Sequence, residues 1–200
     1  MPVLGITGGI GTGKSSVTEI LAGQLGAEVF DADAEAHRLI AGDAAVREGI
    51  QGLLGTGVFG GSPAEERRRI RDRVFGNADL RRELEGILHP RIRLAWQGRA
   101  EAVRAKGGWL CVDIPLLFET GAGALFERTI VVACSAEVQR SRLRELRGLS
   151  EGLADKIIAS QADLRLKIRA ADHVIWNDWT LAVAGSQCEL LSACLKACYG

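Results

Sequence analysis

The sequence lacks several features that define whole classes of protein. Its 25 basic and 25 acidic residues leave a net charge of zero at pH 7, so a strongly basic surface for nucleic acid is not expected. No apolar run is long enough to cross a bilayer, and no repeat or low-complexity tract is present. With 47% apolar and 25% charged residues, the 200-residue chain is predicted to be a soluble globular protein with a substantial core.

The sequence also lacks the cysteine patterns of disulfide-bonded and zinc-binding proteins. Five cysteines without a CxxC pair argue against a disulfide framework and against a zinc site. We interpret all of them as reduced thiols, although Cys194 and Cys198 lie one helical turn apart and leave a metal pair as an alternative. The chain enters its first apolar run without a basic lead, so a cytoplasmic location is expected.

A glycine-rich segment follows that first apolar run, residues 3–6. Residues 8–15 read GGIGTGKS and match the phosphate-binding pattern GxxxxGKS at every fixed position. Glycine lets the backbone curl tightly enough for several N–H groups to surround a phosphate chain. Lys14 is expected to reach the β- and γ-phosphates, and the Ser15 hydroxyl to complete a Mg²⁺ shell at the start of a helix. The predicted ATP-binding residues are Gly8, Gly9, Ile10, Gly11, Thr12, Gly13, Lys14, Ser15 and Ser16.

Two other nucleotide motifs are absent. A dinucleotide-binding GxGxxG needs a third glycine where Ser16 stands. A guanine-reading NKxD is missing, since Asn177 is followed by Asp178 and Trp179. The alternative to a triphosphate site is a glycine-rich turn that contains lysine by chance, and the strand before and helix after favour the site.

Apolar runs and helical stretches alternate along the chain. Further strands are predicted at 28–30, 109–114, 129–133 and 173–176. This alternation predicts an α/β fold with a parallel sheet, helices on both faces and the ligand at the carboxyl ends of the strands. Residues 44–106 show only helical periodicity, which we interpret as an insertion that holds a second substrate.

Three aspartates lie at or just after the ends of predicted strands. Phosphoryl transfer to an alcohol needs a carboxylate near the acceptor hydroxyl, and we predict Asp33 as this base. Asp31 is a supporting or metal-shell carboxylate, or equally the cap of the next helix. Asp113 is predicted to contribute to the Mg²⁺ site, with an ordinary strand-end turn as the alternative because Pro115 follows.

The whole set of segments resembles the dephospho-coenzyme A (CoA) kinase family, which phosphorylates the ribose 3′-hydroxyl in the last step of CoA synthesis. The matching pieces are GITGGIGTGKSS at 5–16, DADAEAHRL at 31–39, RVF at 73–75, LEGILHPRI at 84–92, DIPLLFE at 113–119 and ADHVIWN at 171–177. Many ATPases share the first piece, whereas DAD, HPRI and PLLFE in this order are more discriminating. The resemblance also implies that Asp33 is the catalytic base.

This resemblance implies a P-loop NTPase three-layer sandwich with a parallel sheet, a helical acceptor-binding insertion and a lid. As one domain, 1–200, it would have its core at 1–43 and 107–200, its insertion at 44–106 and its lid at 139–165. The lid is arginine-rich and is expected to close over the phosphates. We assign Arg142 to this role. The position of the family's second lid arginine is occupied by Leu146 here, and a shift of one residue in the turn would bring Arg147 to that position as an alternative.

Four further residues are predicted on the acceptor side. Arg67 offers a bidentate fork to a pyrophosphate, although its arginine-rich run at 65–73 also fits a solvated helix face. His89 matches the family's HP motif or simply caps a helix kink at Pro90. Leu116 either walls the acceptor pocket or belongs to the core, and Glu119 is the polar exception beside it.

The predicted function is ATP-dependent phosphorylation of dephospho-CoA to CoA and ADP, with ATP and Mg²⁺ as cofactors. We expect small-molecule partners, no nucleic-acid or membrane partner, and a monomer or small homo-oligomer. The alternatives are a nucleoside or nucleotide monophosphate kinase, and a nucleotide-dependent switch or motor. A switch or motor would hydrolyse triphosphate without an acceptor, whereas a lid-gated kinase would do so only slowly.

Overall fold

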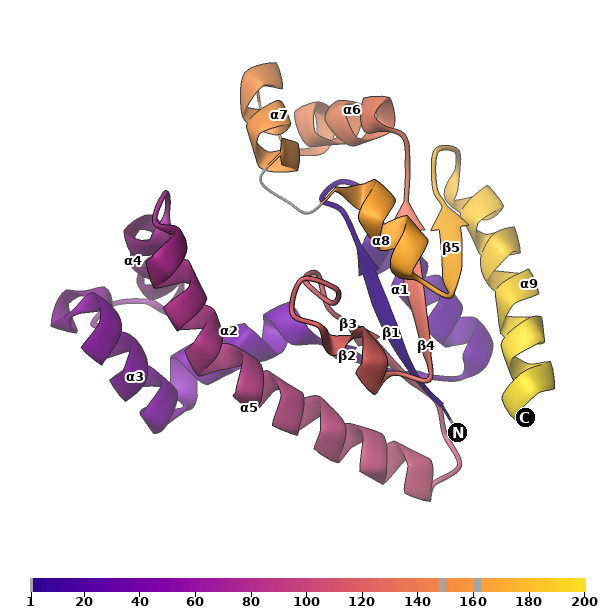
Figure 1. The fold of residues 1–200 in the computed structure, drawn as a ribbon, viewed down its shortest axis with the longest axis horizontal. Helices are drawn as coiled ribbons and strands as arrows, with labels where there is room; N and C mark the ends of the chain where they lie inside the picture. The colour runs from indigo at the N-terminus through magenta and orange to yellow at the C-terminus, as the bar shows by residue number, and fades with distance from the viewer. Residues whose placement is uncertain (1, 148–149, 160–162) are drawn as a thin grey trace. The chain divides into compact units, whose positions relative to one another are not determined.

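The computed structural model describes residues 2–147, 150–159 and 163–200 (Figure 1). It divides into two compact units. The first unit comprises Met1–Phe30 and Arg99–Gly200, and the second comprises Asp31–Gly98.

A parallel sheet forms the centre of the first unit. Its strands are β1 (Val3–Gly8), β2 (Glu28–Asp31), β3 (Leu110–Asp113), β4 (Arg128–Ala133) and β5 (His173–Trp176), in the order β2-β3-β1-β4-β5. Strand β1 is parallel to β3 and β4, and β4 is parallel to β5. All six residues of β1 are buried. The predicted α/β fold with a parallel sheet is therefore confirmed, with strand ends shifted by one or two residues.

Helices cover the sheet of the first unit. The helices α1 (Lys14–Leu25) and α9 (Leu181–Tyr199) pack together, and Leu21 and Leu195 meet Ile6 of β1 in one apolar cluster. Figure 1 shows α8 (Leu164–Ala170) on the other side of the sheet, where it contacts β4. The remaining helices of this unit are η2 (Ala122–Leu125), α6 (Ala136–Arg147) and α7 (Glu151–Ala159).

The second unit is built from helices. These are α2 (Ala32–Gly42), α3 (Ala44–Leu54), η1 (Thr56–Val58), α4 (Pro63–Val74) and the first part of α5 (Ala78–Ala105). Helix α4 begins with a capping box between Ser62 and Glu65. The unit begins earlier than the insertion expected at 44, because Leu39 and Ile40 of α2 belong to its apolar core.

The state of the cysteines and the apolarity of the helices can also be read from the structure. The five cysteines are free, and burial raises the pKa of Cys111 to about 12, so this thiol stays protonated. Among the described helices, none combines the length and apolarity that a membrane span requires.

Candidate active site

The phosphate-binding segment joins the end of β1 to the start of α1. Gly11 and Gly13 have φ of 75° and 81°, a left-handed conformation that favours glycine, and Gly13 is the N-cap of α1. The Thr12 hydroxyl donates to the Gly9 carbonyl at 2.8 Å and closes the turn. Ser15 is exposed in the first turn of the helix. The segment therefore presents N–H groups and the positive end of a helix dipole, which is an anion site.

Glycine at two of these positions also leaves room for close neighbours. A Cβ atom at Gly8 would lie 2.6 Å from the Val132 carbonyl oxygen. A Cβ atom at Gly13 would lie 2.4 Å from the Asn177 side-chain nitrogen. Both distances are too short for a side chain, so the glycine pattern reflects packing behind the segment as well as backbone conformation.

Side chains from α6 and from the end of β5 hold the carbonyls of this segment. Gln139 Nε2 donates to Ile10 O at 2.7 Å, and Asn177 Nδ2 donates to Thr12 O at 2.8 Å. The Arg142 guanidinium donates to Thr12 O at 3.2 Å and to Asn177 O at 2.8 Å. The predicted lid arginine therefore lies against the backbone of the phosphate segment, and the sequence analysis missed the roles of Gln139 and Asn177.

An ion pair lies beside the phosphate segment. Lys14 Nζ, in the first turn of α1, donates to Asp113 Oδ1 at the end of β3. Asp113 is in register with Ile6 of β1, so two neighbouring parallel strands bring the carboxylate to the edge where the glycine segment begins. The side chains are only 16% and 8% exposed, which strengthens their attraction.

The segment after β3 is fixed by a buried lysine. Lys167 Nζ on α8 donates to Glu119 Oε1 and to Pro115 O, both at 2.8 Å. Leu116 is half-buried and Leu117 is fully buried, where it packs against Gly5 on the sheet. The structure thus places Glu119 in an ion pair with Lys167 and keeps Leu116 at the surface of the same segment.

The predicted carboxylate pair lies at the start of α2 in the second unit. Asp31 Oδ1 accepts hydrogen bonds from Asp33 N at 2.8 Å and Ala34 N at 3.0 Å, so Asp31 caps this helix. Asp33 is exposed in its first turn. The capping alternative for Asp31 is therefore what the structure shows.

Two other acceptor-side residues lie on helices of the second unit. Arg67 is half-buried on α4. His89 is half-buried on α5, and this burial lowers its pKa more than the nearby Glu85 raises it. Pro90 follows within a helix that continues to Ala105, so the expected kink does not end α5.

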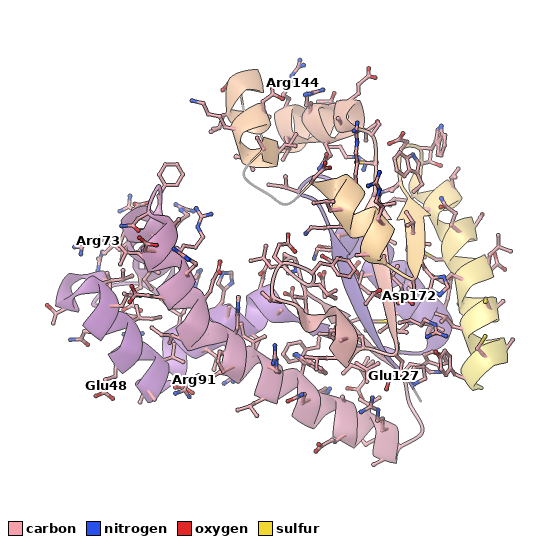
Figure 2. All side chains as sticks on the ribbon, in the orientation of Figure 1. Glu48, Arg73, Arg91, Glu127, Arg144 and Asp172 are labelled. Atoms are coloured by element: carbon pink, nitrogen blue, oxygen red, sulfur yellow. The ribbon has the colours of Figure 1, made fainter. Side chains whose placement is uncertain are left out.

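The predicted lid segment contains the arginine-rich helix α6 and the helix α7, which are in contact. Arg140 Nε of α6 donates to Asp155 Oδ1 of α7 at 2.7 Å, and both side chains are about half exposed. Arg144 is exposed on α6 (Figure 2). The side chain of Arg147 lies outside the described residues.

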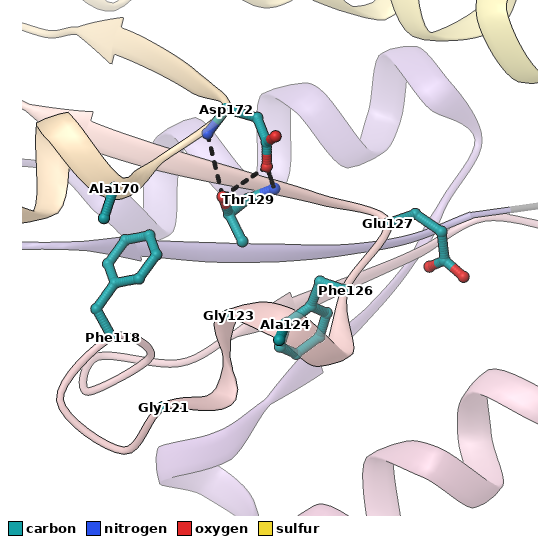
Figure 3. Close-up of a pocket in the computed structure, with 9 residues that line it drawn as sticks. All are labelled: Phe118, Gly121, Gly123, Ala124, Phe126, Glu127, Thr129, Ala170 and Asp172. Carbon is teal, nitrogen blue, oxygen red and sulfur yellow. Dashed lines mark hydrogen bonds between the residues drawn. The ribbon is translucent and has the colours of Figure 1, made fainter.

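A cavity of about 430 Å³ lies elsewhere in the first unit (Figure 3). Its lining includes Thr129 near the start of β4 and Asp172 just before β5, so it lies at the amino ends of these strands. Asp172 accepts from Thr129 N and Oγ1, both at 2.7 Å. Burial raises the pKa of Asp172, but these bonds outweigh it and hold the pKa below its usual value. This cavity is therefore at the opposite edge of the sheet from the phosphate segment.

Comparison with known proteins agrees with this geometry. The family model for dephospho-CoA kinase matches residues 2–182. A dephospho-CoA kinase from Chromobacterium violaceum is 39% identical over 91% of this chain and 88% of its own length. The crystal structure of a Thermus thermophilus protein has a TM-score of 0.80 and 29% identity, covering 99% of this chain and 98% of that chain. A dephospho-CoA kinase structure from Campylobacter jejuni has a TM-score of 0.70 and 27% identity, covering 94% of each chain. This chain belongs to the dephospho-CoA kinase family.

Proposed function

We propose that this chain transfers the γ-phosphoryl group of ATP to the ribose 3′-hydroxyl of dephospho-CoA, which gives CoA and ADP in the last step of CoA biosynthesis. This assignment follows from its membership of the family. The observation in the structure that carries it is the phosphate segment ending at the N-terminus of α1, with Lys14 and Asp113 paired beside it. Phosphoryl transfer depends mainly on such positioned positive charge.

Lys14 is the residue proposed to act on the transferring group. Its ammonium lies at the start of α1, directly after the glycine segment that binds the phosphates. A cation at this position neutralises charge on the γ-phosphoryl oxygens as the bond to ADP breaks. Arg142, whose guanidinium donates to Thr12 O of the same segment, is proposed to contribute a second positive charge.

Asp33 is proposed as the general base. The neighbouring carboxylate, Asp31, accepts two backbone N–H bonds and is committed to capping α2. Asp33 lies on the first turn of this helix and is exposed to solvent, so a substrate hydroxyl can approach it. We therefore propose that Asp33 takes the proton from the ribose hydroxyl and that Asp31 holds the turn in place.

The proposed Mg²⁺ ligands are Ser15 and Asp113. A hydroxyl and a carboxylate are hard oxygen donors, and Mg²⁺ typically keeps several waters and binds through only one or two protein groups and the phosphates. The first turn of α1 carries Ser15 and the end of β3 carries Asp113, which fits such a sparse set. When bound, Mg²⁺ supplies charge neutralisation on the β- and γ-phosphates.

The acceptor site is proposed to use Arg67, His89, Leu116 and Glu119, together with the turn capped by Asp31. Arg67 offers a planar fork to the pyrophosphate of dephospho-CoA. Because Glu119 pairs with Lys167, we assign it a role in holding the segment at 113–119 rather than a direct charge contact with the anionic acceptor.

We propose that the second unit binds the acceptor, that 139–165 acts as a lid, and that the enzyme works in the cytoplasm as a monomer or small homo-oligomer. Nucleic acid and membranes are not proposed as partners. A zero net charge gives no support to either kind of anionic partner.

The decisive experiment measures ADP release from ATP and Mg²⁺ with and without dephospho-CoA, and identifies the product by mass. We expect release that depends on dephospho-CoA and a product heavier by one phosphate. Release that responds instead to a nucleoside or nucleoside monophosphate would leave the phosphate segment in place but overturn the acceptor. Release without any acceptor would indicate a switch or motor.

A further inference from the structure

Three side chains outside the glycine pattern converge on the phosphate segment. Gln139 and Arg142 come from α6, and Asn177 directly follows β5. Together they donate to three consecutive carbonyls, those of Ile10, Gly11 and Thr12. Gln139 and Asn177 are only 5% and 2% exposed. We call these three side chains the carbonyl clamp.

The direction of these carbonyls fixes the direction of the N–H groups. In a trans peptide the C=O of one residue and the N–H of the next point to opposite sides. Bonds to Ile10 O and Thr12 O therefore turn the N–H groups of Gly11 and Gly13 away from the clamp. No hydrogen bond among the described residues uses these two N–H groups. They are the donors that an anion-binding nest presents.

The side chain of Asn177 is placed for hydrogen bonding through its amide nitrogen and not through its oxygen. Its Oδ1 atom is buried without a hydrogen-bond partner in the described part of the chain. A buried unpaired acceptor disfavours folding, so the Oδ1 atom does not account for an asparagine at this position. Its amide nitrogen, in contrast, donates to Thr12 O. This nitrogen lies so close to the Gly13 backbone that a Cβ atom at position 13 would be only 2.4 Å from it. The side chain is thus placed for its donor.

We propose that Gln139, Arg142 and Asn177 are positioning residues that hold the phosphate segment in its binding conformation before ATP arrives. The proposal rests on the proposed function, because it assumes that this segment binds the phosphates of ATP. Without the clamp, the left-handed glycines can rotate their peptide planes, and part of the binding free energy is used to restore them. The clamp affects binding of a polyphosphate and leaves acceptor binding unchanged.

The first test is Gln139→Met, which keeps the length of the side chain and removes the donor to Ile10 O. Calorimetry on the whole protein measures the dissociation constant for inorganic tripolyphosphate with Mg²⁺. We expect it to rise about threefold to tenfold, the effect of losing one hydrogen bond. The KM for ATP should rise in parallel, with the KM for dephospho-CoA unchanged. Asn177→Ser should show the same pattern.

Gln24→Met is the matched control. Gln24 Nε2 also donates to a backbone carbonyl, that of Gly185 at 3.2 Å, but at the other end of α1. The same substitution there should leave the tripolyphosphate constant unchanged. Equal weakening by the Gln24 and Gln139 variants, or wild-type binding by both clamp variants, would overturn the clamp.

A measurement on the wild-type protein covers the case in which the variants fail to fold. Hydrogen exchange resolved by NMR should show fast exchange at the Gly11 and Gly13 amides, and protection when tripolyphosphate binds. Slow exchange at both amides without ligand would mean that they point into the protein, which contradicts the proposal. If wild-type protein neither binds tripolyphosphate nor phosphorylates dephospho-CoA, the proposed function falls and the clamp with it.

Discussion

Lys167 Nζ lies 2.8 Å from Glu119 Oε1, and the Lys167 side chain is only 2% exposed. The same ammonium lies 2.8 Å from Pro115 O, which also accepts the Thr7 hydroxyl at 3.0 Å. The buried cation therefore fastens the segment after β3 to α8, and the Thr7 hydroxyl fastens the same segment to β1. A buried ammonium is tolerated only with such partners, because leaving water is costly for a charge.

Lys167→Met should destabilise the protein by about 1 to 3 kcal/mol, since two charge-assisted hydrogen bonds are lost and Glu119 remains. Urea unfolding measures this change. Lys196→Met is the control: Lys196 also donates to a backbone carbonyl, that of Gln24, but at an exposed site. There we expect a change within about 0.5 kcal/mol. Equal effects at both lysines would contradict a special role for burial.

Asp33→Asn should lower kcat by about a hundredfold or more, because general-base catalysis contributes about 10²- to 10⁴-fold. Binding of ATP, measured by calorimetry, should be unchanged. Asp43→Asn is a matched control: Asp43 caps α3 through a bond from Val46 N at 2.9 Å, and asparagine caps helices equally well. Near-normal turnover of the Asp33 variant would remove this residue from the base role.

Lys14→Met should reduce turnover even at saturating ATP, because the ammonium is needed most as the phosphoryl group transfers. It also removes the ammonium that pairs with the buried Asp113 carboxylate, which should cost on the order of 3 kcal/mol of stability. The double variant Lys14→Met/Asp113→Asn should recover much of the unfolding free energy but no activity. A double variant as unstable as the single one would show that the ion pair does not control stability.

Arg67→Gln should raise the KM for dephospho-CoA by about tenfold and leave the KM for ATP unchanged, because a charged hydrogen-bond fork to pyrophosphate is lost. Initial rates at varied acceptor and varied ATP measure the two constants. Arg68→Gln, at the exposed neighbouring position on α4, should change neither. Equal changes in both constants of the Arg67 variant would place Arg67 outside the acceptor site.

His89 predicts an acid-sensitive stability. Burial lowers its pKa, so the folded protein favours the neutral ring. The stability from this residue is complete above its unfolded pKa of about 6.5 and is lost as the pH falls through the lower folded value. His89→Gln should therefore flatten the fall in unfolding free energy between about pH 7 and about pH 5. His37→Gln, exposed on α2, is the control, and an equally flat profile for it would contradict this origin.

The sequence predicted the sheet well because its signals are local. Each strand contains a short apolar run, and GGIGTGKS lies between the first of them and an amphipathic helix. The start of the second unit at Asp31 was not predicted, because it depends on where Leu39 and Ile40 pack. Local patterns do not encode such tertiary contacts.

The carbonyl clamp was also beyond sequence reasoning. Gln139 and Asn177 contact carbonyls 129 and 165 residues away, and although both lie in segments that resemble the family, no local pattern indicates these two contacts. The ion pair of Glu119 could not be predicted for the same reason, since its partner Lys167 lies on a helix that follows the arginine-rich stretch. For Arg142, charge indicated the neighbourhood of the phosphates, and only the structure shows which atoms it touches.

The central place of β1 has a consequence for how the protein folds. This strand precedes both of its partner strands in the sequence, since Leu4 pairs with Cys111 on one side and with Arg128 on the other. During synthesis this apolar strand therefore has no paired strand until β3 and β4 have also been made, more than 100 residues later. Such distant pairings make folding slow and expose the strand to aggregation. The helices of Asp31–Gly98, whose apolar core is formed by residues nearer in sequence, can assemble during this delay.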